Sequence, residues 1–357
     1  MKTSTDDFCP QWASAPGETI ADILRERNIS EDEFARKLGH SADYAASLLQ
    51  GRSTITIATA RQLERTVGGS VEFWIARDYQ YRQQSARLRV NDQEWLSQLP
   101  LADIIRFGWI APEPHPSEEV AACLRFFDVA SISSWHDKYD RLQEMVAFRT
   151  SPSFDSQPAA VITWLRRGEI EADAIKCNAW NPESFRASLP QIRSLTREKE
   201  PEQFLPALRD LCAASGVAVV VVRAPRGCRA SGATRFLSRQ KALLQLSFRY
   251  LSDDHFWFTL FHEAGHLLLH GQDGFFLEGP ETPSTQQEDQ ANEFAANTLV
   301  PAELRNEMLR LRNARAIIRF ARRIGISRGV VVGQLQHRGR LGRDQLNYLK
   351  TRYQWAD

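Results

Sequence analysis

The segment 262–266, His-Glu-Ala-Gly-His, combines the side chains that hydrolytic metal sites use. Histidines four residues apart fall on one face of a helix and can bind one metal ion. Glu263 follows the first histidine, about 100° further round the helix, and can reach a water at the metal without being a ligand. The spacing predicts zinc-assisted hydrolysis, with His262 and His266 as ligands and Glu263 as general base.

The flanks of this motif predict a buried helix. Aromatic and leucine side chains dominate 256–261 and 267–269, polar capping candidates occupy 252–254, and Gly271 is expected to end the helix. The alternative is a surface helix with two solvated histidines. A buried helix would not hold two histidines and a glutamate unless a partner satisfied them, and a metal ion satisfies all three.

A catalytic zinc usually has three protein ligands, so a third ligand is expected elsewhere in the chain. A second helical pattern begins near Glu288, with Asn292 one turn later on the same face. We expect Glu288 to be the third ligand and Asn292 to accept a hydrogen bond from a ligand histidine. Glu293, Glu278 and Glu281 are the alternatives, and Glu288 could instead complement the helix dipole. Three small residues would let the two helices approach closely: Ala291, Ala295 and Ala296.

Five other polar residues near the motif have no firm role. His270 is too far along the helix to share a metal with His262, and it is predicted to be structural, like His255. Tyr250, Arg235 and His337 are candidate donors to the oxyanion, and the sequence does not choose between them.

HEAGHLLLH, followed by EDQANEFAANTLVP, closely resembles the ImmA/IrrE-type metallopeptidases. The pattern of that family is HExxH, a variable gap and E-x-x-A-N-x-F-A-A-x-x-L-x-P, and this chain departs from it only at Val300, where Met is frequent. The resemblance extends from roughly Phe204 to the C-terminus. It implies a zincin-like zinc endopeptidase whose substrates are partner repressor proteins.

The N-terminal segment has the pattern of a second module, with five helices between about residues 16 and 80. A capping box opens the second helix at Ser30, Gly39 and His40 form a turn, and the next helix is expected over Ser41–Leu49. The fifth helix is expected over 71–79. Through PGETIADILRER and GRSTIT, the segment resembles Xre-type helix-turn-helix domains of the HigA antidote type.

This resemblance makes Ser41–Leu49 the recognition helix. The expected contacts are Arg36, Lys37 and Arg52 on phosphates, and Ser41, Asp43 and Ser47 on bases. Residues 1–80 nevertheless hold nine Lys and Arg against twelve Asp and Glu, an unfavourable balance for DNA affinity. The alternative is a helical module for dimerisation or partner binding.

The whole chain is predicted to be α+β, in three regions. Residues 1–85 form the helix-turn-helix domain, 86–203 a mixed helical connecting and substrate-selecting region, and 204–357 the zincin-like metallopeptidase domain. Strands are expected over 217–222, 232–237 and 242–248, followed by a helical end. That end is basic, since 302–357 hold thirteen Lys and Arg against four Asp and Glu. It either contacts nucleic acid or an acidic substrate, or walls the protease cleft.

Five scattered cysteines without a CxxC pair fit a reduced cytoplasm, and the chain shows no signal or membrane-spanning segment. We therefore expect a cytoplasmic, homodimeric zinc endopeptidase and transcriptional regulator, of the kind found in stress responses and toxin–antitoxin systems. It would cleave a repressor or antitoxin and bind double-stranded DNA. The alternative is a non-catalytic HigA-like antitoxin or repressor with structural zinc, against which the presence of Glu263 argues.

Overall fold

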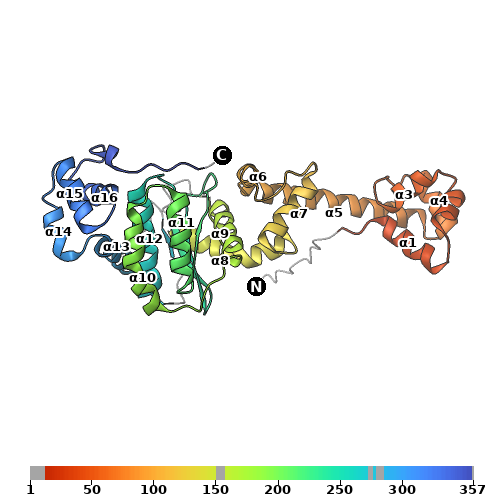
Figure 1. The fold of residues 1–357 in the computed structure, drawn as a ribbon. Helices are drawn as coiled ribbons and strands as arrows, with labels where there is room; N and C mark the ends of the chain where they lie inside the picture. Colours follow the sequence, from red (N-terminus) through yellow and green to blue (C-terminus); the bar gives the residue numbers. More distant parts are fainter. Residues whose placement is uncertain (1–12, 150–156, 272–275, 279–284, 356–357) are drawn as a thin grey trace, which may run out of the picture. The chain divides into compact units, whose positions relative to one another are not determined.

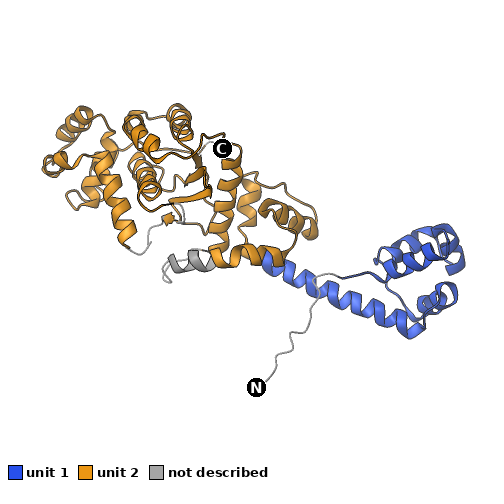
Figure 2. Cartoon of the chain, turned by 90° about the horizontal axis from the view of Figure 1, so that it is seen from below, with its two compact units in different colours: residues 1–96 blue, residues 97–357 orange. Residues whose placement is uncertain are grey.

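The computed structural model describes residues 13–149, 157–271, 276–278 and 285–355. The chain divides into two compact units, residues 1–96 and 97–357, coloured separately in Figure 2. The first unit is helical. The second combines helices with one small sheet, so the predicted α+β class is confirmed.

The described part of unit 1 contains four helices and most of a fifth, where the sequence indicated five. They are α1 (Pro16–Glu26), α2 (Glu31–Leu38), α3 (Ala42–Leu49), α4 (Ile57–Val67) and α5 (Val71–Gln98). Ser30 caps α2 and Ser41 caps α3, each accepting a hydrogen bond from a backbone N–H three residues on. Gly39 takes a left-handed conformation between the two helices (φ 75°), which makes the turn of a helix-turn-helix.

The last helix of unit 1 is longer than expected. The sequence indicated an end near Tyr79, whereas α5 continues to Gln98. Residues 80–98 contain neither glycine nor proline, and Pro100 is the first residue that cannot continue a helix. The structure therefore has no break at residue 85, where the first domain was expected to end.

The sheet of unit 2 has four strands in the order β1-β3-β2-β4: Val217–Val221, Lys241–Leu246, Gly232–Ser238 and Phe276–Glu278. β1 pairs with β3 in parallel, while β2 pairs antiparallel with both β3 and β4. The three strands expected from the sequence are present with ends shifted by at most two residues.

Helices cover both faces of this sheet. Because side chains alternate along a strand, Val217 and Val219 pack on one face and Ala218 and Val220 on the other. The first face contacts α11 (Pro201–Ala213) and α12 (Asp253–Leu269), and the second contacts α9 (Pro158–Asp173) (Figure 1). Burial on both faces explains the continuous apolar run of β1.

The other helices of unit 2 precede and follow this layered core. Before the sheet come α6 (Leu101–Arg106), α7 (Pro116–Phe127), α8 (Ile132–Arg149), α10 (Pro182–Ser194) and the 3₁₀ turn η1 (Leu195–Arg197). After α12 come α13 (Gln286–Leu299), α14 (Ala302–Met308), α15 (Ala314–Ile324), α16 (Arg328–His337) and the 3₁₀ turn η2 (Asn347–Leu349).

The helices between residues 97 and 203 belong to the same compact unit as the sheet. α9 packs on β1 and β3 through Trp164 and Leu165, and the Trp164 indole donates a hydrogen bond to the Val222 carbonyl at 2.9 Å. α10 packs against α11, α12 and α13. These helices therefore help to build the core that supports the site.

The helix α12 is buried along most of its length and packs against α13 and α16. The approach of α13 is close, since a methyl group added at Gly265 would lie 3.2 Å from the Ala291 Cα and 3.1 Å from the Phe294 ring. Ala291 and Ala295 are fully buried at this contact. Small residues therefore bring the backbones of the two helices together, as the sequence indicated.

The start of α12 is held by the C-terminal segment. Thr351 accepts a backbone hydrogen bond from Asp253 and returns one to the Asp253 carboxylate, each at 3.0 Å. The Ser327 hydroxyl also donates to that carboxylate, and Lys350 pairs with the buried Asp254 at 2.7 Å. The basic helical end is thus fixed to the helix that bears the histidines. Of the helices in the described residues, none is long and apolar enough to cross a membrane.

A substitution at Gly329 tests how strongly the C-terminal segment is attached to α12. A methyl group added there would overlap the Asp253 carboxylate, which three donors hold in place. We expect Gly329→Ala to lower the free energy of unfolding by about 1–3 kcal/mol, although alanine favours a helix over glycine. Urea unfolding followed by circular dichroism measures this.

Gly342→Ala is the control, because a methyl group there would meet only exposed side-chain ends of Asp344 and Gln345. It should change the free energy of unfolding by less than about 0.5 kcal/mol. Equal stability of the two variants would show that the packing against Asp253 yields at no cost.

Candidate metal centre

Two helices bring three potential metal ligands together. His262 and His266 lie one turn apart on α12, both 1% exposed, with their Nε2 atoms 3.0 Å apart. Glu288, in the first turn of α13, places its Oε2 3.1 Å from the His262 Nε2 and 3.4 Å from the His266 Nε2. All three ligand atoms lie within 4.8 Å of one another.

The chemistry of these atoms fits a zinc ion. Ligands about 2.0–2.1 Å from a tetrahedral zinc are roughly 3.4 Å apart, close to the separations found here. Two imidazole nitrogens and a carboxylate are also a donor set that zinc prefers. Buried electron-pair donors this close to one another need a shared proton or a cation between them.

Further contacts fix the orientation of both imidazoles. The Nδ1 of His262 lies 3.0 Å from Asn292 Oδ1, and that of His266 lies 2.9 Å from His270 Nδ1. His270 Nε2 in turn lies 3.0 Å from Gln290 Oε1. With protons on both ligand Nδ1 atoms, each bond has one donor and one acceptor, which leaves both Nε2 lone pairs for a metal.

His270 thus has a role that was not predicted from the sequence, which is to contact the ligand His266. It was expected to be only a structural residue at the end of the helix, and it does occupy the C-cap of α12, followed by Gly271 with φ 78°. Its ring also links His266 to Gln290 on α13. The i to i+4 spacing from His266 was the available signal.

Glu263 lies beside the ligand set and is fully buried. The Thr234 hydroxyl donates to Glu263 Oε2 at 2.6 Å. Gly232 leaves room for this carboxylate, since a methyl group added there would lie 2.6 Å from Glu263 Oε1. The sequence predicted the strand β2 but not that Gly232 and Thr234, two residues apart on one face, would contact the glutamate.

The electrostatics favour an ionised Glu288 and a neutral His266 imidazole. Burial raises the pKa of Glu288, but the two imidazoles that lie against its carboxylate outweigh this effect and hold its pKa at about 2. Burial also lowers the pKa of His266, against the opposing effect of Glu288. A carboxylate and neutral imidazoles are the forms that bind metal.

The alternative ligands lie elsewhere or are not described. Glu293 is exposed, and its carboxylate pairs with Arg305 at 3.2 Å, away from the histidines. The side chain of Glu278 and all of Glu281 lie outside the described parts of the chain. Glu288 is therefore the carboxylate that the described residues place beside both histidines.

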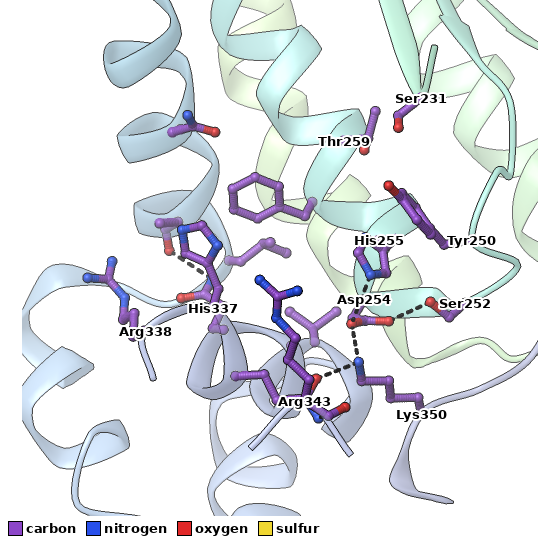
Figure 3. Close-up of a pocket in the computed structure, with 18 of the residues that line it drawn as sticks. Ser231, Tyr250, Ser252, Asp254, His255, Thr259, His337, Arg338, Arg343 and Lys350 are labelled. Carbon is purple, nitrogen blue, oxygen red and sulfur yellow. Dashed lines mark hydrogen bonds and ion pairs between the residues drawn. The ribbon is translucent and has the colours of Figure 1, made fainter. Parts of the chain in front are cut away.

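A cavity of about 1100 Å³ adjoins this site (Figure 3). Asn292 and Thr259 line it near the metal ligands, and two of the three candidate oxyanion donors, Tyr250 and His337, also line it. Arg235 does not, because it alternates with Thr234 on β2 and pairs with Glu169 of α9, on the other face of the sheet. Arg235 is therefore excluded as an oxyanion donor.

The residues predicted to contact DNA lie together around α2 and α3 of unit 1. Arg36, Lys37, Ser41, Asp43 and Arg52 are exposed, although Lys37 pairs with Glu33 at 2.9 Å. Ser47 differs from the rest. It is half-buried, and its hydroxyl is hydrogen-bonded to that of Ser53, so it is less available to a base than expected.

Comparison with known proteins finds a similarity in each of the two units. Residues 216–336 match the peptidase M78 family, described as the IrrE N-terminal-like domain. This span contains the four strands, the helices α12 to α15 and all but the last residue of α16. Unit 2 therefore contains an IrrE N-terminal-like domain, and the resemblance noted in the sequence is confirmed.

A second similarity concerns the N-terminal part. The chain is 35% identical over 60 residues to YddM, an uncharacterized HTH-type transcriptional regulator of Escherichia coli (strain K12). The match covers 17% of this chain and 64% of the length of YddM. It agrees with the helix-turn-helix geometry of α2 and α3.

Metal content tests the ligand set. We expect about one zinc ion per chain in the wild type and its loss in Glu288→Ala, because two imidazoles alone hold zinc weakly. Glu263→Gln should keep its zinc, since Glu263 is not placed as a ligand. Elemental analysis after dialysis against a weak chelator gives the ratio. Full zinc content in Glu288→Ala would move the third ligand to another carboxylate.

Proposed function

We propose that this protein is a zinc-dependent endopeptidase that cleaves a partner regulatory protein, such as a repressor or antitoxin. The observation that supports this most directly is the position of Glu263. Its buried carboxylate lies next to His262 and is held by Thr234, outside the set of three ligand atoms. The match of residues 216–336 to a peptidase family supports the same proposal.

In this proposal, His262, His266 and Glu288 would hold zinc, which supplies Lewis-acid activation of water and of the scissile carbonyl. Asn292 and His270 keep the two imidazoles in the ligand orientation. Glu263 accepts the proton of the attacking water and delivers it to the leaving amine. Thr234 orients the Glu263 carboxylate for both transfers. Tyr250 and His337 remain the candidate donors to the oxyanion.

The competing proposal is a non-catalytic repressor or antitoxin in which zinc is structural. Structural zinc sites usually have four protein ligands and no open position. The described residues offer three ligands at this site, and a structural site has no use for a second acidic side chain held beside them. We therefore favour the enzyme.

A conservative substitution tests the proposed chemistry. Glu263→Gln keeps the shape of the side chain and an acceptor for Thr234, but it removes the base. We expect cleavage of a partner encoded by a neighbouring gene to slow by about 100- to 10,000-fold. The measurement is the rate at which purified partner disappears on gels, with zinc content and thermal unfolding monitored in parallel.

Glu303→Gln provides the matched control, since Glu303 is an exposed glutamate of α14 that does not line the cavity. It should cleave the partner at close to the wild-type rate. If Glu263→Gln cleaved the partner as fast as the wild type, the general-base mechanism would be wrong.

We also propose that unit 1 binds double-stranded DNA through α2 and α3. The helix-turn-helix geometry and the similarity to an HTH-type regulator support this. The recognition helix has no basic residue and the region is acidic overall, so binding should be weak and strongly weakened by salt. Two copies in a homodimer would double the number of phosphate contacts.

The phosphate contacts can be counted from a salt series. Each lost contact reduces the slope of log affinity against log salt by about 0.9. Arg36→Ala/Lys37→Ala/Arg52→Ala should therefore reduce the slope by about 2–3 for each bound chain. Fluorescence anisotropy on the protein's own promoter region gives the slope.

The control variant removes three exposed arginines that lie elsewhere in unit 1: Arg25→Ala/Arg27→Ala/Arg65→Ala. It should keep the wild-type slope. If the two triple variants behaved alike, α2 and α3 would serve dimerisation or partner binding and not DNA.

A further inference from the structure

The cavity beside the metal centre has a basic lining that the proposed reaction does not use. It lies between α12, α13, α16 and the C-terminal segment, and we call it the basic groove (Figure 3). Its cationic lining residues are Arg305, Arg338, Arg343, Lys350 and Arg352, joined by His255 and His337. Its acidic lining residues are Asp254, Asp289 and Glu293.

Two of the cations already have anionic partners. Lys350 pairs with Asp254 at 2.7 Å, and both side chains are buried at the floor of the groove. Arg305 pairs with Glu293 at 3.2 Å. Arg352 donates to the backbone carbonyl of Tyr250 at 3.4 Å.

Arg338 and Arg343 are different. Both side chains are exposed, and neither forms an ion pair with an acidic side chain among the described residues, although the charge of Arg338 helps to lower the pKa of Glu293. Arg343 extends into the groove from the C-terminal segment, and Arg338 approaches from the end of α16 (Figure 3). Arginine binds carboxylates through two parallel hydrogen bonds, so this pair is suited to an anionic ligand.

The groove adjoins the metal centre, although none of the three ligand residues lines it. Asn292, which orients His262, forms part of its lining, as do Phe258 and Thr259, one turn before His262 on α12. The Phe258 ring lies 6.5 Å from the His262 ring and 6.3 Å from the His337 ring. An extended polypeptide crossing the metal site would therefore continue past Phe258 into the groove.

Size and shape favour a polypeptide over other anions. The volume, about 1100 Å³, is at or above the upper end of the range of about 300–1,000 Å³ typical of small-molecule sites. A DNA duplex is too wide to enter a cavity of this size. Tyr250 and Phe258 add aromatic surface that suits side chains of a peptide.

We propose that the basic groove binds an acidic segment of the protein substrate, several residues from the bond that is cleaved, with Arg338 and Arg343 contacting its carboxylates. The role as a substrate site rests on the proposed peptidase function, but the binding itself does not. An acidic segment would position the substrate and distinguish it from other unfolded chains.

The experiment uses full-length, zinc-loaded protein carrying Glu263→Gln, so that binding is measured without cleavage. The probe is a fluorescein-labelled ten-residue peptide of alternating Glu and Ala, compared with the same peptide carrying Gln in place of Glu. We expect the Glu peptide to bind at least about tenfold more tightly at 50 mM salt, because only it offers carboxylates. Fluorescence anisotropy gives both affinities.

Adding Arg338→Glu/Arg343→Glu should weaken binding of the Glu peptide at least about tenfold, and Arg338→Gln/Arg343→Gln should weaken it less. Neither arginine has an ion pair to lose, so thermal unfolding should not change. Arg319→Glu/Arg322→Glu is the control, because these exposed arginines of α15 do not line the groove and the change in charge is the same. It should bind the Glu peptide like the parent protein.

Several results would overturn the proposal. The first is equal loss of binding in the α15 control, which would indicate general attraction to a basic surface. The second is displacement of the peptide by a few millimolar inorganic phosphate, which would indicate a site for small anions. The third is tighter binding of a short DNA duplex through the same two arginines. If the peptide bound as expected and wild-type protein cleaved no partner, the peptidase function would fail and the groove assignment would stand.

Discussion

Most of unit 2 can be understood from one constraint, the burial of two imidazoles and a carboxylate within hydrogen-bonding distance of one another. Such a cluster is costly in a protein interior unless every polar atom has a partner. Here, Asn292 and His270 engage the outer nitrogens of the two histidines, and the inner atoms converge on a point that a cation can occupy. These polar groups would otherwise be better solvated by water, so the surrounding fold has to keep them buried and in position.

Close packing of α12 on its neighbours supplies the rigidity. Gly265 and the alanines of α13 bring the two ligand-bearing helices together, so that Glu288 reaches both histidines. On the side of the sheet, Gly232 has a similar effect. It has no side chain, so the Glu263 carboxylate fits against β2 and accepts the hydrogen bond from Thr234. Each small residue thus sets a distance that a larger side chain would lengthen, and the site depends on those distances more than on any one strong interaction.

The C-terminal segment connects this rigid centre to a surface of different chemistry. Asp253 and Asp254, at the start of α12, are held by Ser327, Lys350 and the backbone of Thr351. The same attachment carries arginines to the side of the helix that bears the metal ligands, and these line the basic groove. Part of the positive charge of residues 302–357 is therefore concentrated beside the metal centre, where a substrate would lie.

The local sequence determined a large part of this protein. Helix periodicity and capping residues gave the helices α1 to α4 and α12, and the strands followed from apolar runs bounded by turns. The spacing of His262, Glu263 and His266 within one helix predicted a metal site, because residues four apart in a helix lie on the same face. Glu288 could also be predicted as the third ligand from local sequence, because it lies at the start of a second helical pattern and matches the motif of the metallopeptidase family.

Contacts between distant segments could not be read in this way. Thr234 and Gly232 meet Glu263 only because β2 lies against α12, and Arg235 is turned toward α9 by the alternation of the same strand. Distant contacts also join residues 97–203 to the unit that holds the sheet. They bring Arg338 and Arg343 to the same cavity as Asn292. The sequence by itself determined which residues could do chemistry, since short-range geometry fixes their spacing. Only the tertiary structure decided which side chains surround them, since that depends on how the helices and strands pack.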